Sequence, residues 1–332
     1  MKKNSHYQYL HLAQFIGAIL VVAVHSGTLT NNPQLHFFLK NILGRIAVPF
    51  FIVNNAFFFR SKPTERKTDW FIRICKTYLL WSVIYLPLGF QYLQQNFNLK
   101  PLLYLPALFV GLLYTGIYYH LWYFPALLLA VVLVTKLVKK FGYFKSFIFL
   151  SFLYSLGAVE TYSAFFTNSD IQNILDFLFS IILTTRNGLF FSSIFVLIGF
   201  LIADYQDKFA ENRTKLLSGV IILPVIILIE SLAIYHHQGM DKNFFFYLLP
   251  LMLVGFPLMI TPSRKKWFPS LRKYGQFIFF VHLIPIEIFN LIIANSSNTP
   301  LLGWIRLALG IIVPIICLML FEKVKPLDLL KS

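Results

Sequence analysis

Long apolar stretches, separated by short polar segments, follow one another along almost the whole chain. A helix needs about 20 mainly apolar residues to cross the ~30 Å hydrocarbon core of a bilayer. By that measure the pattern predicts an all-α, polytopic membrane protein with about ten transmembrane helices. We expect a single integral-membrane domain over residues 1–332, because no repeat or low-complexity tract interrupts the pattern. The predicted spans lie near residues 10–29, 36–59, 71–93, 120–138, 146–163, 186–204, 216–237, 243–260, 276–295 and 300–321.

The segment 102–118 is also apolar, but proline or glycine stands at positions 101, 106, 111 and 116. We interpret this segment as a re-entrant or interfacial helix, because a further full crossing would place the later basic loops outside. The first apolar stretch is long enough to span. We therefore interpret it as the first helix and not as a signal peptide.

The distribution of charge gives the expected orientation. The chain carries 29 Lys and Arg residues against 13 Asp and Glu, a net charge of +16. If the N-terminus is inside, 23 of these 29 basic residues fall in inner segments, as the positive-inside rule requires. Both termini are therefore expected in the cytoplasm of a bacterial cell, with the lipid bilayer and not nucleic acid as the partner of the basic runs. The inner segments are 1–9, 60–76, 136–145, 205–215, 261–275 and 322–332.

Two ionisable residues at bilayer depth are candidate catalytic groups, since a charge there costs from about 2.5 to more than 10 kcal/mol. At 1.5 Å per residue, His25 lies roughly 22 Å from the inner end of its span, and Arg45 roughly 21 Å. These similar heights predict a site in which Arg45 favours the neutral imidazole that a general base requires. The alternative is that His25 only bonds a backbone group while Arg45 snorkels.

Further polar residues lie at the predicted outer ends of spans. His120 opens the run His-Leu-Trp-Tyr-Phe-Pro, which is also typical of an aromatic belt at the interface. Arg186 and Asn187 begin the sixth span, where a solvated helix start is the simpler interpretation. Glu160 and Glu230 lie in the outer thirds of their spans, where each can pair with an outer arginine.

Lys40 and Arg306 also lie in or at the edges of spans, and His282 lies in the ninth span, nearer the inner face. Cys75 and Cys317 give no disulfide framework and no metal site. The phosphate-binding, dinucleotide-binding, metalloprotease and nucleophile-elbow motifs are missing, so we expect no metal and no tightly bound cofactor.

The sequence resembles the membrane-bound acyltransferase family 3, and within it the membrane domain of the serine/alanine racemases tied to vancomycin resistance. The likeness runs from about Tyr9 to the last span, with a late-span histidine at the end of Phe-Ile-Phe-Phe-Val-His (277–282). Four patches carry it, namely Gln-Phe-Ile-Gly-Ala-Ile-Leu-Val-Val-Ala-Val-His (14–25), Arg-Ile-Ala-Val-Pro-Phe-Phe (45–51), Tyr-Tyr-His-Leu-Trp-Tyr (118–123) and Arg-Asn-Gly-Leu-Phe-Phe (186–191).

The resemblance implies a ten-helix core that transfers acyl groups, commonly acetyl from acetyl-CoA, to sugars, peptidoglycan or other extracytoplasmic acceptors. It implies that His25 and Arg45 are catalytic. Two departures from the family pattern are Gln14, which stands where the family has a basic residue, and Asn55-Ala56, where it often has Ser-Gly. The expected substrate-binding residues are Gln14, His120, Tyr123, Arg186, Asn187 and His282.

We therefore expect an acyl-CoA-dependent O-acyltransferase, whose donor docks against the basic inner loops and whose acceptor is an extracytoplasmic glycan or another hydroxyl compound. His25 either deprotonates the acceptor or carries the acyl group transiently, and Arg45 stabilises the oxyanion. The alternative is a non-catalytic transporter or export helper for an amino acid or a glycan precursor. A third interpretation is an inactive family member that acts as a partner protein.

Overall fold

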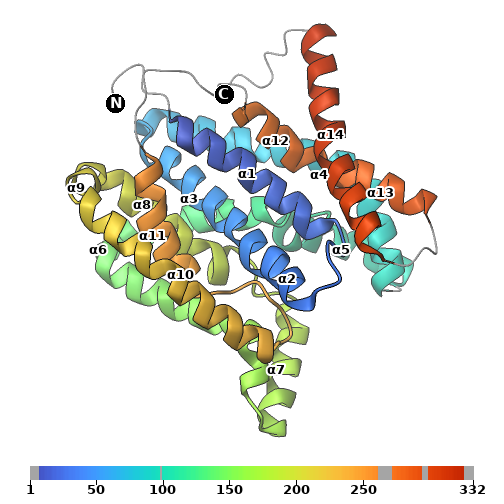
Figure 1. The fold of residues 1–332 in the computed structure, drawn as a ribbon, viewed down its shortest axis with the longest axis horizontal. Helices are drawn as coiled ribbons and strands as arrows, with labels where there is room; N and C mark the ends of the chain where they lie inside the picture. Colours follow the sequence, from blue (N-terminus) through green and yellow to red (C-terminus); the bar gives the residue numbers. More distant parts are fainter. Residues whose placement is uncertain (1–6, 98, 261–270, 294–297, 325–332) are drawn as a thin grey trace. The chain divides into compact units, whose positions relative to one another are not determined.

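The computed structural model describes residues 7–97, 99–260, 271–293 and 298–324, and in these residues it contains helices and no strand (Figure 1). This confirms the all-α prediction for the described part of the chain. The longer helices are α1 (Gln8–His25), α3 (Ala47–Arg60), α4 (Lys67–Phe97), α6 (Tyr123–Tyr162), α7 (Ser169–Ile182), α8 (Ser193–Asp204), α10 (Arg213–His236), α11 (Leu248–Met259), α12 (Leu271–Val281), α13 (Leu283–Ile292) and α14 (Pro300–Val324).

Short helical pieces join these helices. They are α2 (Pro33–Phe37), α5 (Tyr104–Val110) and α9 (Gln206–Glu211), the π-helical turns η1 (Phe38–Leu43), η5 (Gly111–Thr115) and η7 (Gly188–Ser192), and the 3-10 turns η2 (Gly44–Ile46), η3 (Thr64–Arg66), η4 (Pro101–Leu103) and η6 (Ser163–Phe165).

Five of the described helical segments are long and apolar enough to cross a membrane. A sixth results if α12 and α13, which meet at an angle of 42°, form one bent span. The chain is therefore a membrane protein by length and composition, while ten crossings and cytoplasmic termini stay predictions. The predicted inner segments 1–9, 261–275 and 322–332 lie partly outside the described residues, which leave out 1–6, 261–270 and 325–332. The five segments are Gln8–His25, Pro33–Arg60, Thr64–Phe97, Arg213–His236 and Pro300–Glu322.

Two breaks divide long helical runs. Gly142, with a φ of +73°, interrupts α6 inside the predicted inner segment 136–145. The bend between α12 and α13 has a chemical reason in Pro285, which lacks an N–H and whose ring would clash with the carbonyl of Val281. The second break falls in the middle of the stretch 276–295, which the sequence predicted as one span.

The sequence did not predict α7, which lies in the expected outer loop between the fifth and sixth spans. Asn168 caps this helix, because its side chain accepts hydrogen bonds from the N–H groups of Asp170 and Ile171 at 2.8 and 3.2 Å. Three short consecutive helical pieces over residues 101–115 occupy most of the segment 102–118, whose re-entrant or interfacial placement stays a prediction.

The described helices fall into two compact units. The first unit comprises Met1–Phe51, Arg213–Tyr235 and Val254–Ser332, and the second comprises Ile52–Asn212 and His236–Leu253.

In the first unit α1 packs against α12 and α14. Glycines allow the close approach, because a Cβ on Gly275 of α12 would stand 3.0 Å from Phe15 Cα, and one on Gly310 of α14 would stand 2.6 Å from Val22 Cγ1. Burial of apolar surface is the main force that holds these helices in contact. The buried core residues here are Ala18, Val22, Ile278 and Ile286.

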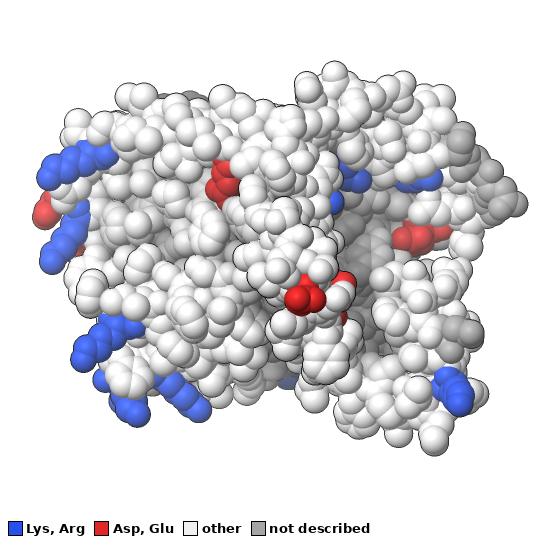
Figure 2. Space-filling view, turned by 90° about the horizontal axis from the view of Figure 1, so that it is seen from below, with Lys and Arg blue, Asp and Glu red and all other residues white. Residues whose placement is uncertain are grey.

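In the second unit α6 packs against α4, η7 and α8. Gly199 of α8 fits against α3, where an added Cβ would stand 2.7 Å from Val53 O. Lys, Arg, Asp and Glu occupy a small part of the face drawn in Figure 2. Large exposed apolar side chains such as Val83, Phe152 and Leu102 agree with a surface that faces lipid. The aromatic core comprises Tyr154, Phe191, Phe195 and Phe244.

Candidate functional site

The centre of the candidate site in the first unit is the C-terminal end of α1. His25 is the last residue of this helix and is half-buried. Ser26 closes the helix, because its N–H donates to Ala23 O at 3.3 Å and its hydroxyl donates to Val22 O at 2.7 Å. Gly27 then turns the chain with a φ of +76°, which L-residues rarely adopt. The imidazole is thus fixed at the junction of a helix and a tight turn.

His282 lies beside His25, with ring centroids 5.5 Å apart and ring planes inclined by 30°. The His282 ring is fully buried at the bend between α12 and α13. Its Nδ1 stands 3.0 Å from Ile278 O and 2.9 Å from Phe279 O. Because a carbonyl oxygen only accepts, Nδ1 carries the hydrogen, and Nε2 of the neutral ring carries a lone pair.

The bounds of this helix differ from those expected from the sequence. The ninth span was predicted to begin at residue 276, whereas α12 begins at Leu271. His282 therefore lies 11 residues beyond the start of α12, about 16 Å along a helix axis. That His282 lies nearer the inner face of the membrane stays a prediction.

Arg45 lies in η2, among the irregular turns that lead from α2 to α3. Its neighbour Gly44 packs so closely on α1 that an added Cβ would stand 2.4 Å from Val24 Cγ2. Val24 directly precedes His25 in the sequence. Arg45 and His25 therefore each directly follow a residue of this contact, while their common height in the membrane stays a prediction.

Two further cations, Lys40 and Arg306, meet at the turn after α1. Lys40 Nζ donates to Gly27 O at 2.9 Å. Arg306 Nη1 lies 2.9 Å from the position that a Cβ on Gly27 would occupy. Both Arg45 and Arg306 act on the Lys40 charge by Coulomb repulsion. Lys40, Arg45 and Arg306 thus form a group of like charges, which we call the cationic cluster.

Amide side chains hold the Arg306 guanidinium. Its Nε donates to Asn290 Oδ1 at 2.8 Å, and its Nη1 donates to Asn298 Oδ1 at 2.9 Å. Asn290 in turn donates to Glu287 Oε2 at 3.2 Å. Lys40 and Arg306 were missing from the site expected from the sequence, although each was noted as a cation in or at the edge of a span. A cation within an apolar stretch that has no evident partner in the sequence was the signal by which Lys40 and Arg306 could have been predicted as site residues.

Gln14 lies apart from this cluster. It stands 11 residues before His25 on α1, about 16 Å along the helix axis. A Cβ on Gly275 would stand 3.1 Å from Gln14 O, so α12 covers this part of the helix. Gln14 Oε1 is buried and accepts no hydrogen bond from the described residues.

The second unit holds Arg186, whose guanidinium carbon lies 4.9 Å from the ring centroid of Trp122, a cation–π contact. The carboxylates of Asp241 and Glu160 attract the Arg186 charge. Glu160 also accepts hydrogen bonds from the Thr185 N–H at 3.2 Å and from the Thr185 hydroxyl. The sequence did not show which outer arginine pairs with Glu160. The structure identifies Arg186 as an arginine that attracts the Glu160 carboxylate.

His120 is buried in an aromatic cluster of the second unit. Its ring meets Tyr85 edge-on, with centroids 4.5 Å apart, and Tyr118 at 5.9 Å. Tyr123, three residues after His120, is also buried. Its hydroxyl accepts a hydrogen bond from Asn55 Nδ2 at 2.8 Å. Asn55, which departs from the family pattern, thus orients a residue of the expected substrate-binding set.

Asn187 is engaged within the protein. Its Oδ1 accepts from the N–H groups of Leu189 and Phe190 at 2.9 and 3.0 Å, which caps η7. Its Nδ2 donates to Tyr114 Oη at 2.9 Å and to Thr184 O at 3.1 Å. The side chain therefore supports the loop that carries Arg186. Across the described residues no group of three or more metal-ligating side chains gathers.

A model of the acyltransferase domain, family 3, matches residues 7–323. The chain belongs to this acyltransferase family. A serine/alanine racemase of Enterococcus gallinarum is 30% identical over 282 residues, which cover 81% of this chain and 39% of the racemase. An amino-acid racemase of Enterococcus faecalis is 29% identical over 275 residues, 80% of this chain and 37% of that protein. The chain thus spans less than two-fifths of the length of these relatives, and no solved structure matches it.

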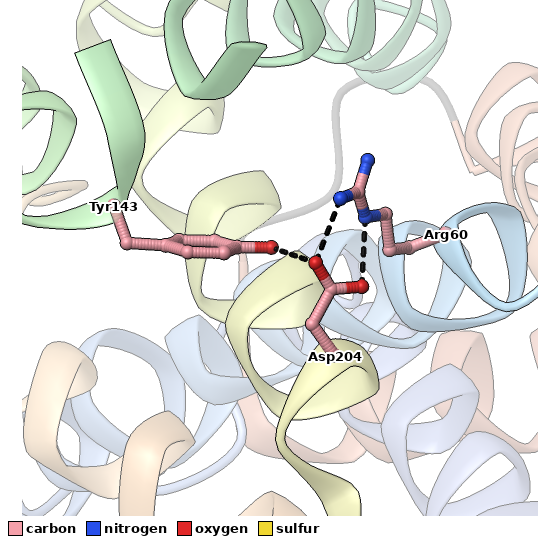
Figure 3. A network of polar contacts seen from close by, with 3 residues as sticks. All are labelled: Arg60, Tyr143 and Asp204. Atoms are coloured by element: carbon pink, nitrogen blue, oxygen red, sulfur yellow. Dashed lines mark hydrogen bonds and ion pairs between the residues drawn. The ribbon is translucent and has the colours of Figure 1, made fainter.

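Arg60, the last residue of α3, belongs to a compact polar network in the second unit of this acyltransferase-family chain (Figure 3). Arg60 donates from Nε and Nη2 to the two oxygens of Asp204 at 2.8 and 2.7 Å. The Tyr143 hydroxyl donates to Asp204 Oδ2 at 2.7 Å. Burial and the Asp204 carboxylate raise the pKa of Tyr143, so the phenol remains a donor at neutral pH. We call these three residues the acidic brace.

Proposed function

We propose that this family member is an acyl-CoA-dependent O-acyltransferase of the bacterial plasma membrane, which moves an acyl group such as acetyl to a hydroxyl of an extracytoplasmic glycan or peptidoglycan acceptor. The observation that carries the proposal is the pair formed by the half-buried His25 and the buried His282, whose ring centroids are 5.5 Å apart. Imidazoles sheltered from water suit proton transfer near neutral pH.

In the proposed reaction His25 accepts the proton of the acceptor hydroxyl while that oxygen attacks the thioester carbon. The carbon–sulfur bond of the tetrahedral intermediate then breaks, and the CoA thiolate takes the proton from the His25 imidazolium. His282 would orient His25, because its Nε2 lone pair can accept a hydrogen bond from the nearer nitrogen of the His25 ring. That would leave the other His25 nitrogen to act as the base.

Arg45 would stabilise the negative oxygen of the tetrahedral intermediate. A preorganised cation is most effective in this role where water is excluded and the dielectric is low. The close packing of Gly44, which precedes Arg45, on Val24, which precedes His25, supports the assignment. Removal of one oxyanion donor typically lowers kcat by about 10²–10³-fold.

We further propose the remaining roles. With ten spans and both termini in the cytoplasm, the basic inner loops would attract the phosphates of acyl-CoA, and Gln14 would hydrogen-bond the donor on its path along α1. For His120, Tyr123 and Arg186, which belong to the second unit, we keep the substrate-binding role expected from the sequence. Asn187 would act indirectly, since its amide caps η7 and supports the loop before it.

The test is acyl transfer by the purified chain in proteoliposomes with labelled acetyl-CoA and an extracted envelope glycan. We expect His25→Ala and Arg45→Gln to lower kcat by at least about 10²-fold, while both variants stay monodisperse. His236→Ala, an exposed histidine at the end of α10, is the matched control. Full activity of His25→Ala would overturn the mechanism.

A second candidate function is transport without chemistry. It is favoured by the two relatives named as racemases of amino acids, although racemisation itself is not assigned to this chain. This candidate predicts uptake of labelled serine into proteoliposomes in the absence of acyl-CoA, and equal uptake by His25→Ala. Uptake that needs no acyl-CoA, together with no acyl transfer, would favour it over the acyltransferase.

A further inference from the structure

Two members of the cationic cluster, Lys40 and Arg306, have more hydrogen-bond donors than the described part of the protein uses. An ammonium has three N–H donors and a guanidinium has five. Among the described residues, Lys40 makes one hydrogen bond, to Gly27 O, and Arg306 makes two, to Asn290 and Asn298. The acceptors in these three bonds are neutral oxygens.

The position of the cluster is unfavourable without a ligand. Lys40 and Arg306 are half-buried and belong to candidate membrane-spanning segments. Both arginines of the cluster repel the Lys40 ammonium. Like charges gathered in a poorly hydrated environment cost free energy, and such groups at membrane depth usually mark a substrate site.

The cluster lies next to the proposed catalytic base. Gly27, which Lys40 and Arg306 both reach, follows His25 by two residues. Two residues of backbone span at most about 7 Å. A ligand that places an anionic group on these cations can therefore present a hydroxyl only a few bonds away to the His25 imidazole.

We infer that the cationic cluster binds an anionic group, a carboxylate or a phosphate, on the acceptor itself, within a few bonds of the hydroxyl that receives the acyl group. This inference rests on the proposed function and names the chemical class of its acceptor. Arg306 would bind the anion with the paired N–H geometry that suits carboxylate and phosphate, and Lys40 would act as a point charge. The amides of Asn290 and Asn298 hold the Arg306 guanidinium toward the turn.

Two measurements on the full-length chain in nanodiscs test the inference. The first is calorimetric binding of glycerol 3-phosphate and glucuronate, the phosphate and carboxylate probes, against the neutral glycerol and glucose. The second is acyl transfer from acetyl-CoA to the same four compounds. The variants are Lys40→Gln and Arg306→Gln, with Arg306→Lys to restore the charge and Lys100→Gln, an exposed lysine of the second unit, as the control.

We expect at least one anionic probe to bind, and the probe that binds identifies the source as phosphate or carboxylate. Lys40→Gln and Arg306→Gln should each weaken this binding by at least about tenfold, the loss expected for a charge-assisted hydrogen bond. Arg306→Lys should recover part of it, and Lys100→Gln should equal the unmodified chain. In acyl transfer, the KM of the anionic acceptor should rise while the KM of acetyl-CoA stays unchanged.

Equal binding of neutral and anionic probes would overturn the inference, as would variants that bind the anion unchanged. A rise in the KM of acetyl-CoA would also contradict it, because the cluster would then serve the donor. If the anion binds and the variants abolish that binding, but no acyl group is transferred to any compound, the anion site stands and the proposed acyltransfer fails. The two failures are thus distinguishable.

Discussion

The cationic cluster of the first unit and the acidic brace of the second unit differ in whether a carboxylate binds the cation directly. In the brace, both oxygens of Asp204 accept from Arg60, and Tyr143 adds a third bond to the same carboxylate. In the cluster, Lys40 and Arg306 bond neutral carbonyl and amide oxygens and repel each other.

The difference separates stability from function. A cation that is matched by a carboxylate within the protein has its donors occupied and holds helix ends together. Cations that repel one another are retained at a cost in stability, and natural proteins accept such costs mainly at functional sites. We therefore expect substitutions in the brace to change stability with little effect on substrate affinity, and substitutions in the cluster to do the reverse.

The largest effect on stability should come from Asp204→Ala, which removes three hydrogen bonds and leaves the half-buried Arg60 without its carboxylate. We expect the free energy of unfolding to fall by about 2–3 kcal/mol, measured by reversible unfolding in mixed micelles. The affinity of the folded fraction for an anionic probe should stay unchanged. Asp207→Ala, an exposed carboxylate of α9, is the control. If Asp204→Ala were as stable as this control, the brace would be a surface contact without energetic weight.

The helical class was predictable because its strongest signal, apolar length, is local to each segment, whereas the ten crossings stay a prediction. The helix α10 (Arg213–His236) lies close to the predicted span 216–237 for this reason. The bend at His282 and the helix α7 were missed because one depends on Pro285 and the other on the Asn168 cap, short signals within stretches interpreted by length alone.

The site was predictable only where a charged or titratable residue stood within an apolar run. His25 and Arg45 were proposed in this way, and the helix rise predicts a common height for them. The partnership of His25 with His282 depends on how α12 packs against α1 and on where α12 begins, which sequence distance does not contain. Lys40 and Arg306, 266 positions apart in the sequence, meet only through the packing of α14 at the turn after α1.

A smaller loss should follow Tyr143→Phe, which removes one bond of the brace and keeps the ring. We expect the free energy of unfolding to fall by about 1–2 kcal/mol at neutral pH. Because the pKa of Tyr143 is raised in the folded chain, this contribution should be complete below the ordinary tyrosine value of about 10. It should disappear as the pH rises above that value and passes the raised pKa. A difference between Tyr143→Phe and the unmodified chain that instead grew with alkaline pH would contradict the bond to Asp204.

The smallest effect should have the opposite sign. Lys40→Gln removes the charge that Arg45 and Arg306 repel, and the shorter amide keeps an N–H donor for the turn at Gly27. We expect the free energy of unfolding to rise by about 0.5–1 kcal/mol, in the same micelle assay, with Lys100→Gln unchanged. A saturating anionic probe should reverse the order, because it stabilises the chain that still has Lys40 more than the variant. A loss of stability in Lys40→Gln without ligand would mean that Lys40 supports the end of α1 as Asp204 supports Arg60, and the contrast between the two regions would no longer hold.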